Sequence, residues 1–136
     1  MTVFVLDASA VLRFLDSEAG ADRVEEILAL RMAQTAEIAI SAVQWGEIAG
    51  KVRKRLGEPG QARALAMLSR FQPIIVTATS DRAVHAAELK VDRRISYADT
   101  FALDVAMDSS DHVLVTADYD FKAVDDLARI EFLPTK

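Results

Sequence analysis

The chain has 136 residues, of which 51% are hydrophobic and 27% charged, and this length fits one compact domain over residues 1–136. The composition is that of a globular protein and excludes disorder or low complexity as its main character. With no cysteine and two histidines, the sequence excludes disulfides, thiolate zinc sites, cysteine nucleophiles and histidine-rich metal sites. The formal net charge of −5, taken as a bulk property, argues against a nucleic-acid partner.

Short β-branched segments alternate along the chain with longer segments rich in good helix formers. The expected strands are Val3–Leu6, Glu37–Ser41, Pro73–Thr77, His112–Thr116 and Arg129–Leu133, all apolar enough to be covered on both faces. The expected helices are Ser9–Leu15, Ala21–Arg31, Val43–Leu56, Gln61–Phe71, Asp81–Arg94 and Ala98–Met107. This alternation predicts an α/β fold with a mainly parallel sheet of about five strands and helices on both faces.

Two of the expected helices have a clear apolar stripe that predicts their buried side. In the first, which Gly57 and Pro59 end, the stripe consists of Trp45, Ile48, Val52 and Leu56. In the second, it consists of Val84, Ala87 and Val91. No segment is long and apolar enough to form a signal peptide or a membrane span, so we expect a soluble, cytoplasmic protein with no membrane partner.

Four acidic residues from distant parts of the sequence follow or adjoin the ends of expected strands. Asp7 and Asp118 come just after strands. Glu47 lies early in the helix after the second strand, and Asp99 lies at the start of the helix that precedes the fourth strand. Ligands of parallel α/β sheets bind beyond the carboxyl ends of the strands, which places all four side chains at one edge. Like charges gathered there need a neutralising partner, and a hard divalent cation with oxygen ligands supplies it.

Each of these residues also has a structural interpretation. Asp7 is a favoured helix N-cap, Asp99 suits the positive end of a helix dipole, and Asp118 is typical of a turn. Glu47 lies away from the apolar stripe of its helix and is spaced to pair with Lys51. The joint pattern, rather than any single residue, favours a functional site.

Four segments of the sequence resemble the acidic motifs of PIN-domain ribonucleases, and their order and flanking residues are most similar to VapC-type toxins of toxin–antitoxin pairs. These segments are Val5–Ala10, Trp45–Ile48, Ser96–Leu103 and Leu114–Phe121. The resemblance covers nearly the whole chain and implies a three-layer α/β/α fold of the PIN type.

The resemblance implies that a set of four carboxylates binds Mg²⁺ or Mn²⁺ and activates water. The set comprises Asp7, Glu47, Asp99 and Asp118, with Ser9 and Thr116 as supporting hydroxyls. Ala117 stands where relatives often have glycine, which is tolerated if the backbone keeps a negative φ. Asp120 is a candidate extra ligand, whereas Asp104 lies about 140° around the helix from Asp99 and is expected to face elsewhere.

RNA, the implied substrate, needs positive charge that the acidic site does not provide. The best candidates are Lys51, Arg53, Lys54, Arg55 and Arg13, with Lys51 and Lys54 on the same side of their helix as Glu47. Weaker candidates for phosphate contact are Lys90, Arg93 and Arg94. A solvated helix face is an equally good interpretation of the Lys51–Arg55 run.

The family resemblance further implies a cognate antitoxin that covers the active site, and a toxin homodimer. The apolar helices Ala21–Arg31 and Gln61–Phe71 offer a groove for a partner helix, although core packing explains them equally well. Two other functions stay open at this stage: a receiver-like Mg²⁺-binding signalling domain, and a PIN-like scaffold that binds RNA or protein without cleavage.

Overall fold

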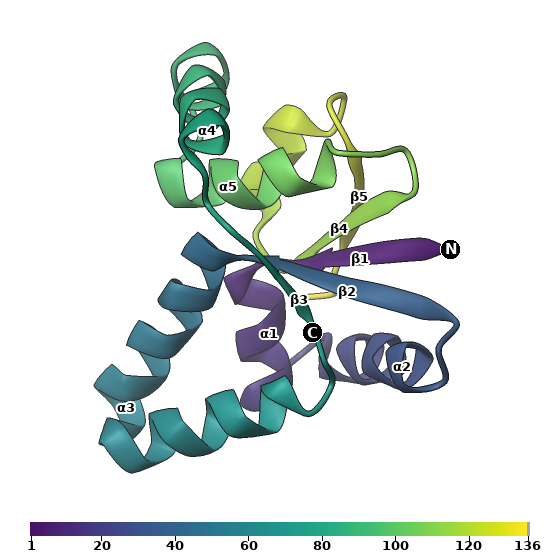
Figure 1. The fold of residues 1–136 in the computed structure, drawn as a ribbon, viewed down its shortest axis with the longest axis vertical. Coiled ribbons are helices and arrows are strands. Elements are labelled where there is room, and N and C mark those ends of the chain that lie inside the picture. Colours follow the sequence, from purple (N-terminus) through teal and green to yellow (C-terminus); the bar gives the residue numbers. More distant parts are fainter. Residues whose placement is uncertain (136) are drawn as a thin grey trace.

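The protein, seen in a computed structural model that describes residues 1–135, has a five-stranded parallel sheet between two layers of helices (Figure 1). The strands are β1 (Thr2–Leu6), β2 (Ala36–Ser41), β3 (Ile74–Val76), β4 (His112–Thr116) and β5 (Arg129–Phe132). Their order in the sheet is β3-β2-β1-β4-β5, and each neighbouring pair is parallel. The predicted three-layer α/β/α fold is therefore confirmed.

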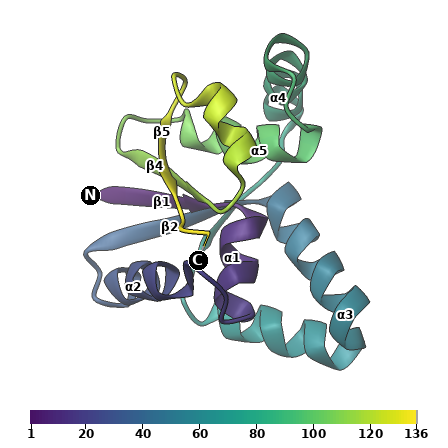
Figure 2. The same ribbon diagram turned by 180° about the vertical axis from the view of Figure 1, so that it is seen from behind.

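The helices divide between the two faces of this sheet, as the front and back views show (Figures 1 and 2). The α-helices are α1 (Ala8–Leu15), α2 (Ala21–Met32), α3 (Ala42–Ser69), α4 (Ser80–Arg93) and α5 (Tyr97–Ala106), and a 3₁₀ helix, η1, covers Tyr119–Val124. Helices α1 to α3 lie on one face, whereas α5 and η1 lie on the other, with α4 stacked outside α5. No helix in the described part of the chain has the length and apolar character needed to cross a bilayer.

The central strands contribute to a hydrophobic core on each face, because successive side chains of a strand point to opposite sides. In β1, Phe4 and Leu6 pack with α1, α2 and α3, whereas Val5 packs with α5 and η1. Strands β2 and β4 divide their residues in the same way. This double burial explains the continuous apolar character of these strands in the sequence.

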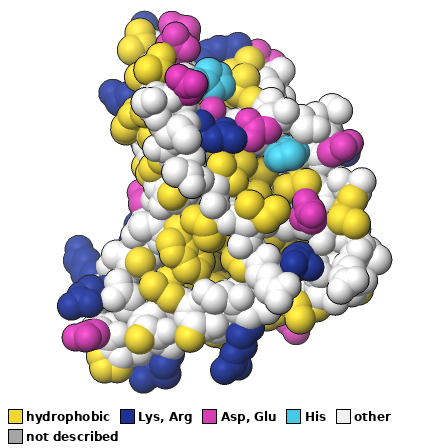
Figure 3. Space-filling model, in the orientation of Figure 1, with side chains coloured by type: hydrophobic (Ala, Val, Ile, Leu, Met, Phe, Trp, Pro, Cys, Tyr) yellow, Lys and Arg dark blue, Asp and Glu magenta, His cyan; other side chains and the backbone are white. Residues whose placement is uncertain are grey.

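The edge strand β3 departs from this pattern. Ile74 and Ile75 are 48% and 38% exposed, so the expectation that all strands are covered on both faces is wrong here. The reason is position, since β3 pairs only with β2 and has no neighbour on its other side. In the view of Figure 3, hydrophobic side chains gather around β3 and between it and the two arms of α3.

Helix α3 bends sharply at the point where the sequence predicts one helix to end and another to begin. Gly57 has φ 72° and ψ −174°, a non-helical conformation that glycine adopts at little cost, and Pro59 follows. Ile48 and Val52 are buried as predicted, but Leu56 is 55% exposed. The first arm of α3 leads away from the sheet, and the bend after Leu56 turns the chain back toward β3 (Figure 1). Leu56 therefore lies at the outer end of the first arm, and the buried stripe ends one turn earlier than expected.

Helix α4 buries a different side from the one its apolar stripe predicts. Val84 and Val91 are 59% and 76% exposed, and Ala87 is also exposed. The buried residues are Ala86 and Leu89, which face α5. Arg82 and His85, on the side of α4 that faces α5, contact Asp104, so polar contacts accompany the burial of Ala86 and Leu89.

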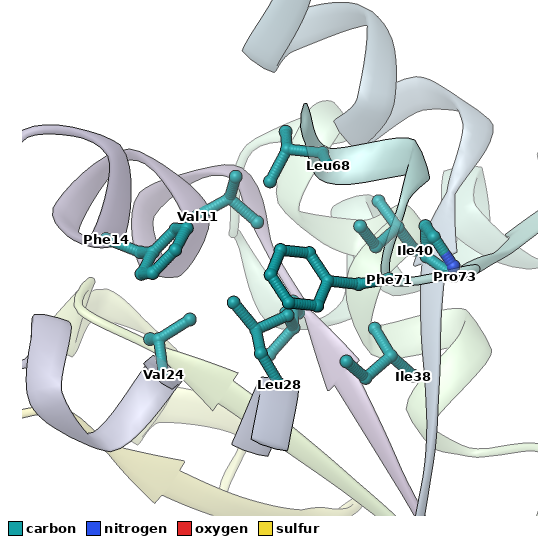
Figure 4. A pocket seen from close by; sticks show the side chains of 10 residues that line it. Val11, Phe14, Val24, Leu28, Ile38, Ile40, Leu68, Phe71 and Pro73 are labelled. Atoms are coloured by element: carbon teal, nitrogen blue, oxygen red, sulfur yellow. The ribbon is translucent and has the colours of Figure 1, made fainter. Parts of the chain in front are cut away.

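The core beneath the sheet contains a small apolar cavity between α1, α2 and the end of α3 (Figure 4). Phe14 and Phe71 meet there edge to face, with ring centroids 6.4 Å apart. Its lining residues are Leu6, Val11, Phe14, Val24, Leu28, Ile38, Ile40, Leu68, Phe71 and Pro73. Because every lining residue is apolar, the cavity belongs to the core and provides no chemistry of its own.

A buried ion-pair network joins α4 to α5. The carboxylate of Asp104 is 5% exposed; it accepts a hydrogen bond from Arg82 Nη1 at 2.8 Å and lies 2.7 Å from His85 Nδ1. Arg82 also donates to Asp108 at 2.7 Å. Asp104 therefore faces α4 and not the acidic residues, as its position in the helix predicted.

We expect Asp104→Ala to lower the free energy of unfolding by about 2–4 kcal/mol, because it leaves Arg82 and His85 without their buried partner. Chemical denaturation measured by circular dichroism checks this. Asp108→Ala is the matched control; its side chain is 39% exposed, so the loss should stay below about 1 kcal/mol. Equal effects of the two changes would contradict the assignment of Asp104 as the central residue.

Candidate active site at the carboxyl edge of the sheet

The acidic residues adjoin the point where the order of strands reverses. From β1 the chain continues to β2 on one side, whereas β4 pairs with β1 on the other side. The carboxyl ends of β1 and β4 are directly joined, because the Asp7 amide donates to the carbonyl of Val115 at 3.3 Å. This switch point is where open α/β sheets bind their ligands.

Asp7 is the buried centre of this edge, with only 2% of its surface exposed. Its Oδ1 accepts hydrogen bonds from Ser9 Oγ at 2.7 Å and from the amide of Ala10 at 2.9 Å. Its Oδ2 accepts from Thr116 Oγ1 at 2.5 Å. The bond from Ala10 makes Asp7 the N-cap of α1, so the structural interpretation of this residue is correct and coexists with the functional one.

The two hydroxyls that bind Asp7 are themselves held in place by the loop after β4. Ser9 Oγ accepts from the amide of Ala117 at 2.9 Å, and Thr116 Oγ1 accepts from the amide of Asp118 at 2.9 Å. Ala117 is not among the residues of positive φ, so alanine fits where relatives often have glycine. The hydrogen bonds thus link Asp7 to the backbone that carries Asp118.

The pKa of the Asp7 carboxyl is raised to about 6, mainly by burial and to a smaller extent by the nearby charge of Asp99, while hydrogen bonds from Thr116, Ala10 and Ser9 act in the opposite direction. Within residues 1–135 no cation pairs with Asp7, and its hydrogen-bond donors there are all neutral. The other buried carboxylate of the described residues, Asp104, is instead paired with Arg82. Asp7 is therefore a buried carboxylate whose charge the protein itself does not neutralise.

Asp99 joins this site from the first turn of α5, where Ser96 caps the helix. Burial is the main cause that raises the pKa of the Asp99 carboxyl, and the neighbouring charges of Asp118, Glu47 and Asp120 raise it further. These influences indicate that acidic residues of four separate segments lie within electrostatic range of one another.

The acidic residues do not form a closed cage. Within residues 1–135, no group of three or more acidic or histidine side chains is arranged so as to hold a metal ion. An open arrangement is compatible with Mg²⁺, which usually retains several waters and binds one or two carboxylates together with substrate phosphates.

Comparisons with known proteins agree with this architecture. The model of the PIN domain family matches residues 4–127, which is most of the chain. The chain belongs to the PIN-domain family. No curated protein has a significantly similar sequence.

Solved structures with the same fold come from VapBC systems. VapBC2 from Rickettsia felis, bound to a promoter DNA fragment, matches with a TM-score of 0.74 and 18% identity over 98% of this chain and 100% of that one. VapC20 from Mycobacterium tuberculosis, described as a toxin that cleaves the sarcin–ricin loop, matches with a TM-score of 0.72 and 20% identity over 98% and 100%. VapBC-5 from the same organism matches with a TM-score of 0.61 and 22% identity over 97% and 98%.

A groove beside the acidic residues of this PIN domain is lined by charges of both signs. Arg13 and Lys51 line it together with Ser9 and the carboxylates of Asp16, Glu18 and Asp118. Arg13 donates to the carbonyl of Ala19 at 3.1 Å, which holds its guanidinium in place. A phosphodiester in this groove would therefore contact both charge types.

The other basic candidates in the Lys51–Arg55 run differ in whether they already form an ion pair or hydrogen bond within the protein. Arg55 forms an ion pair with Asp16, and Arg53 donates to Gln61 Oε1 at 3.0 Å. Lys54 is exposed. Arg93, a weaker candidate on α4, pairs with Asp126 at 2.7 Å. Lys51 is thus the residue of the run that lines the groove.

Sequence reasoning missed Gln44, a polar side chain that is only 1% exposed and lies next to the site. A signal was present, because Gln44 lies four residues before Ile48 and eight before Val52 on the buried stripe of α3. A polar residue on such a stripe is informative, since it must find hydrogen-bond partners in the interior.

The pKa of Asp7 predicts how pH affects the stability of this PIN domain. Between pH 3.8 and about 6 the folded protein binds more protons at Asp7 than the unfolded chain does, so stability falls as the pH rises through this window. We expect Asp7→Asn, measured in chelator, to raise the free energy of unfolding at pH 7.5 by about 1–3 kcal/mol.

Denaturant titrations at pH 7.5 and pH 4 check this expectation, because the gain should shrink at pH 4, where Asp7 is already protonated in the folded protein and partly protonated in the unfolded chain. The exposed residue change Asp111→Asn serves as the control and should show no such dependence on pH. A variant that is less stable than the unaltered protein at pH 7.5 would contradict the assignment.

Proposed function

We propose that this PIN domain is a metal-dependent endoribonuclease, the toxin of a type II toxin–antitoxin pair. The observation that carries the proposal is the buried, cation-free carboxylate of Asp7 at the switch point of the sheet, with further carboxylates close enough to raise its pKa and that of Asp99. Membership of the PIN-domain family and the fold shared with a toxin that cleaves the sarcin–ricin loop support the same activity.

The donor set suits Mg²⁺ or Mn²⁺ as the cofactor. We assign Asp7, Glu47, Asp99 and Asp118 as the residues that hold it, with Ser9 and Thr116 as supporting hydroxyls. A carboxylate offers about four acceptor positions, and three of those of Asp7 are used by hydrogen bonds, so one is free for an ion. When bound, the cation makes water easier to deprotonate and offsets negative charge on the phosphate oxygens.

The protein's own residues orient the substrate in this proposal. Lys51 and Arg13 attract the RNA backbone along the groove and hold the scissile phosphate near Asp118. Lys54, Arg53 and Arg55 extend the positive surface along α3, although the ion pair with Asp16 reduces the contribution of Arg55.

An antitoxin is the partner that we propose for a second groove, which lies between α1 and the two arms of the bent α3. Apolar side chains of Leu15, Val52, Leu56 and Met67 line it, and the Asp16–Arg55 ion pair lies at its edge. The exposure of Leu56 suits a surface that an amphipathic helix covers. The toxin homodimer implied by the family resemblance stays a prediction.

The alternative functions receive less support. A receiver-like signalling domain does not agree with the PIN-domain match. A PIN-like scaffold without activity would have no need of the unpaired buried charge of Asp7, which is expected to destabilise the fold. We therefore favour the enzyme over the scaffold.

Asp99→Asn is expected to reduce RNA cleavage by about 100-fold or more, because it removes a ligand charge without changing the size of the side chain. Cleavage of an RNA panel by the purified, partner-free chain, with Mg²⁺, Mn²⁺ or chelator, measures this. Asp7→Asn should have the same effect with the fold intact by circular dichroism, whereas Asp111→Asn should keep full activity. Cleavage that persists in chelator, or in either site variant, would refute the mechanism.

Lys51→Gln is expected to weaken RNA binding and to lower the slope of log affinity against log salt by about 0.7, the value for one phosphate contact on a single strand. Fluorescence anisotropy in chelator, where cleavage is blocked, measures both quantities. Arg129→Gln is the matched control. It removes one exposed charge at the start of β5, whereas the acidic residues lie at the opposite, carboxyl ends of the strands. Equal effects of the two changes would show that Lys51 contributes only bulk charge.

A further inference from the structure

Gln44 is a polar side chain enclosed in the interior directly beneath the acidic residues. It is 1% exposed and lies in the first turn of α3, three residues before Glu47. Its Oε1 accepts a hydrogen bond from the amide of Ala8 at 2.7 Å, and its Nε2 donates to the carbonyl of Ala98 at 2.6 Å. The amide thus uses its acceptor and one of its donors on backbone groups of two other helices.

Both backbone groups belong to residues next to carboxylates of the site. Ala8 directly follows Asp7 at the start of α1, and Ala98 directly precedes Asp99 in the first turn of α5. One side chain therefore joins the three helices that carry Asp7, Glu47 and Asp99. No other side chain of the described residues has hydrogen bonds that reach both the start of α1 and the start of α5.

The chemistry of these contacts requires an amide of this length. The Ala8 amide lies in the first turn of α1, where no carbonyl of the helix is available to accept its hydrogen bond. A glutamate would accept this bond but could not donate to Ala98, and it would add negative charge to an acidic region. Methionine would fill the same space without either hydrogen bond.

The uncharged contacts of Gln44 with Ala8 and Ala98 are useful here, because the carboxylates repel one another in the protein without an ion. Burial and mutual charge make their approach unfavourable, so the helices that carry them tend to separate unless another contact resists this. Groups behind metal ligands that fix their orientation commonly change metal affinity by 10–100-fold when they are removed. The hydrogen bonds of Gln44 would lower the free-energy cost of ordering the ligands when the ion binds.

We propose that Gln44 is a positioning residue that holds the Asp7 and Asp99 segments at the separation needed to bind the divalent cation. This inference rests on the proposed function, since it concerns the same site. It assigns to α3 a second role beside that of Glu47, because the helix both supplies a ligand and sets the distance between two others.

Isothermal titration of the purified chain with Mn²⁺ tests the inference. Gln44→Met is expected to lower Mn²⁺ affinity by about 10-fold or more while the chain remains folded in chelator by circular dichroism. RNA cleavage by this variant should recover in part when the Mn²⁺ concentration is raised, because the ligands themselves are still present. Affinity within twofold of the unaltered chain would overturn the inference.

A matched control and a second variant keep the test decisive. Gln61→Met removes an amide of the same helix whose hydrogen bonds, with Ala49 and Arg53, stay within α3 and do not reach the segments of Asp7 or Asp99, and it should leave Mn²⁺ affinity unchanged. Gln44→Asn keeps the amide but is one methylene too short to reach both helices, so it should lose affinity several-fold even if the methionine variant does not fold. Full affinity in the asparagine variant would overturn the inference.

The outcomes separate this inference from the proposed function. If the unaltered chain binds no Mn²⁺, or if Asp99→Asn binds it equally well, the proposed function fails and the role of Gln44 fails with it. If the unaltered chain binds Mn²⁺, Asp99→Asn does not, and either Gln44 variant binds as tightly as the unaltered chain, only the role of Gln44 is refuted.

Discussion

The burial of one unpaired carboxylate, Asp7, is the constraint on which the rest of this structure depends. Taking a charge out of water without a counter-charge is unfavourable, and here burial raises the pKa of Asp7 to about 6. Neutral donors on Ser9, Ala10 and Thr116 reduce this cost without removing the charge. The loops after β1 and β4 are arranged around these hydrogen bonds.

The contrast with Asp104 shows that the protein can neutralise a buried carboxylate when structure alone requires it. Asp104 has Arg82 and His85 as partners and joins α4 to α5. Asp7, equally buried, has only neutral partners, and further acidic residues lie near it. The buried charge of Asp7 thus lowers the stability of the fold at the carboxyl ends of the strands. This is the pattern expected where an external cation completes the site.

Much of the fold followed from local sequence, and the errors have clear causes. Each strand and α-helix was predicted within a few residues, because the β-branched runs, helix formers and the Gly57–Pro59 break are local signals. The stripe of Val84 and Val91 is exposed, since α4 turns Ala86, Leu89 and the Asp104 partners Arg82 and His85 toward α5. The sequence analysis does not predict the 3₁₀ helix η1, and Asp118, which is typical of a turn, is the N-cap of this short helix.

The sequence by itself determined the alternation of strands and helices, the four acidic motifs and hence the PIN-domain family. Only the tertiary structure decided which of these charges are paired, because partners such as Arg55 with Asp16 or Arg93 with Asp126 lie 39 and 33 residues apart. It also revealed Gln44, whose two bonds join segments 36 and 54 residues away. Pairing across such separations depends on the strand order, which local propensity does not encode.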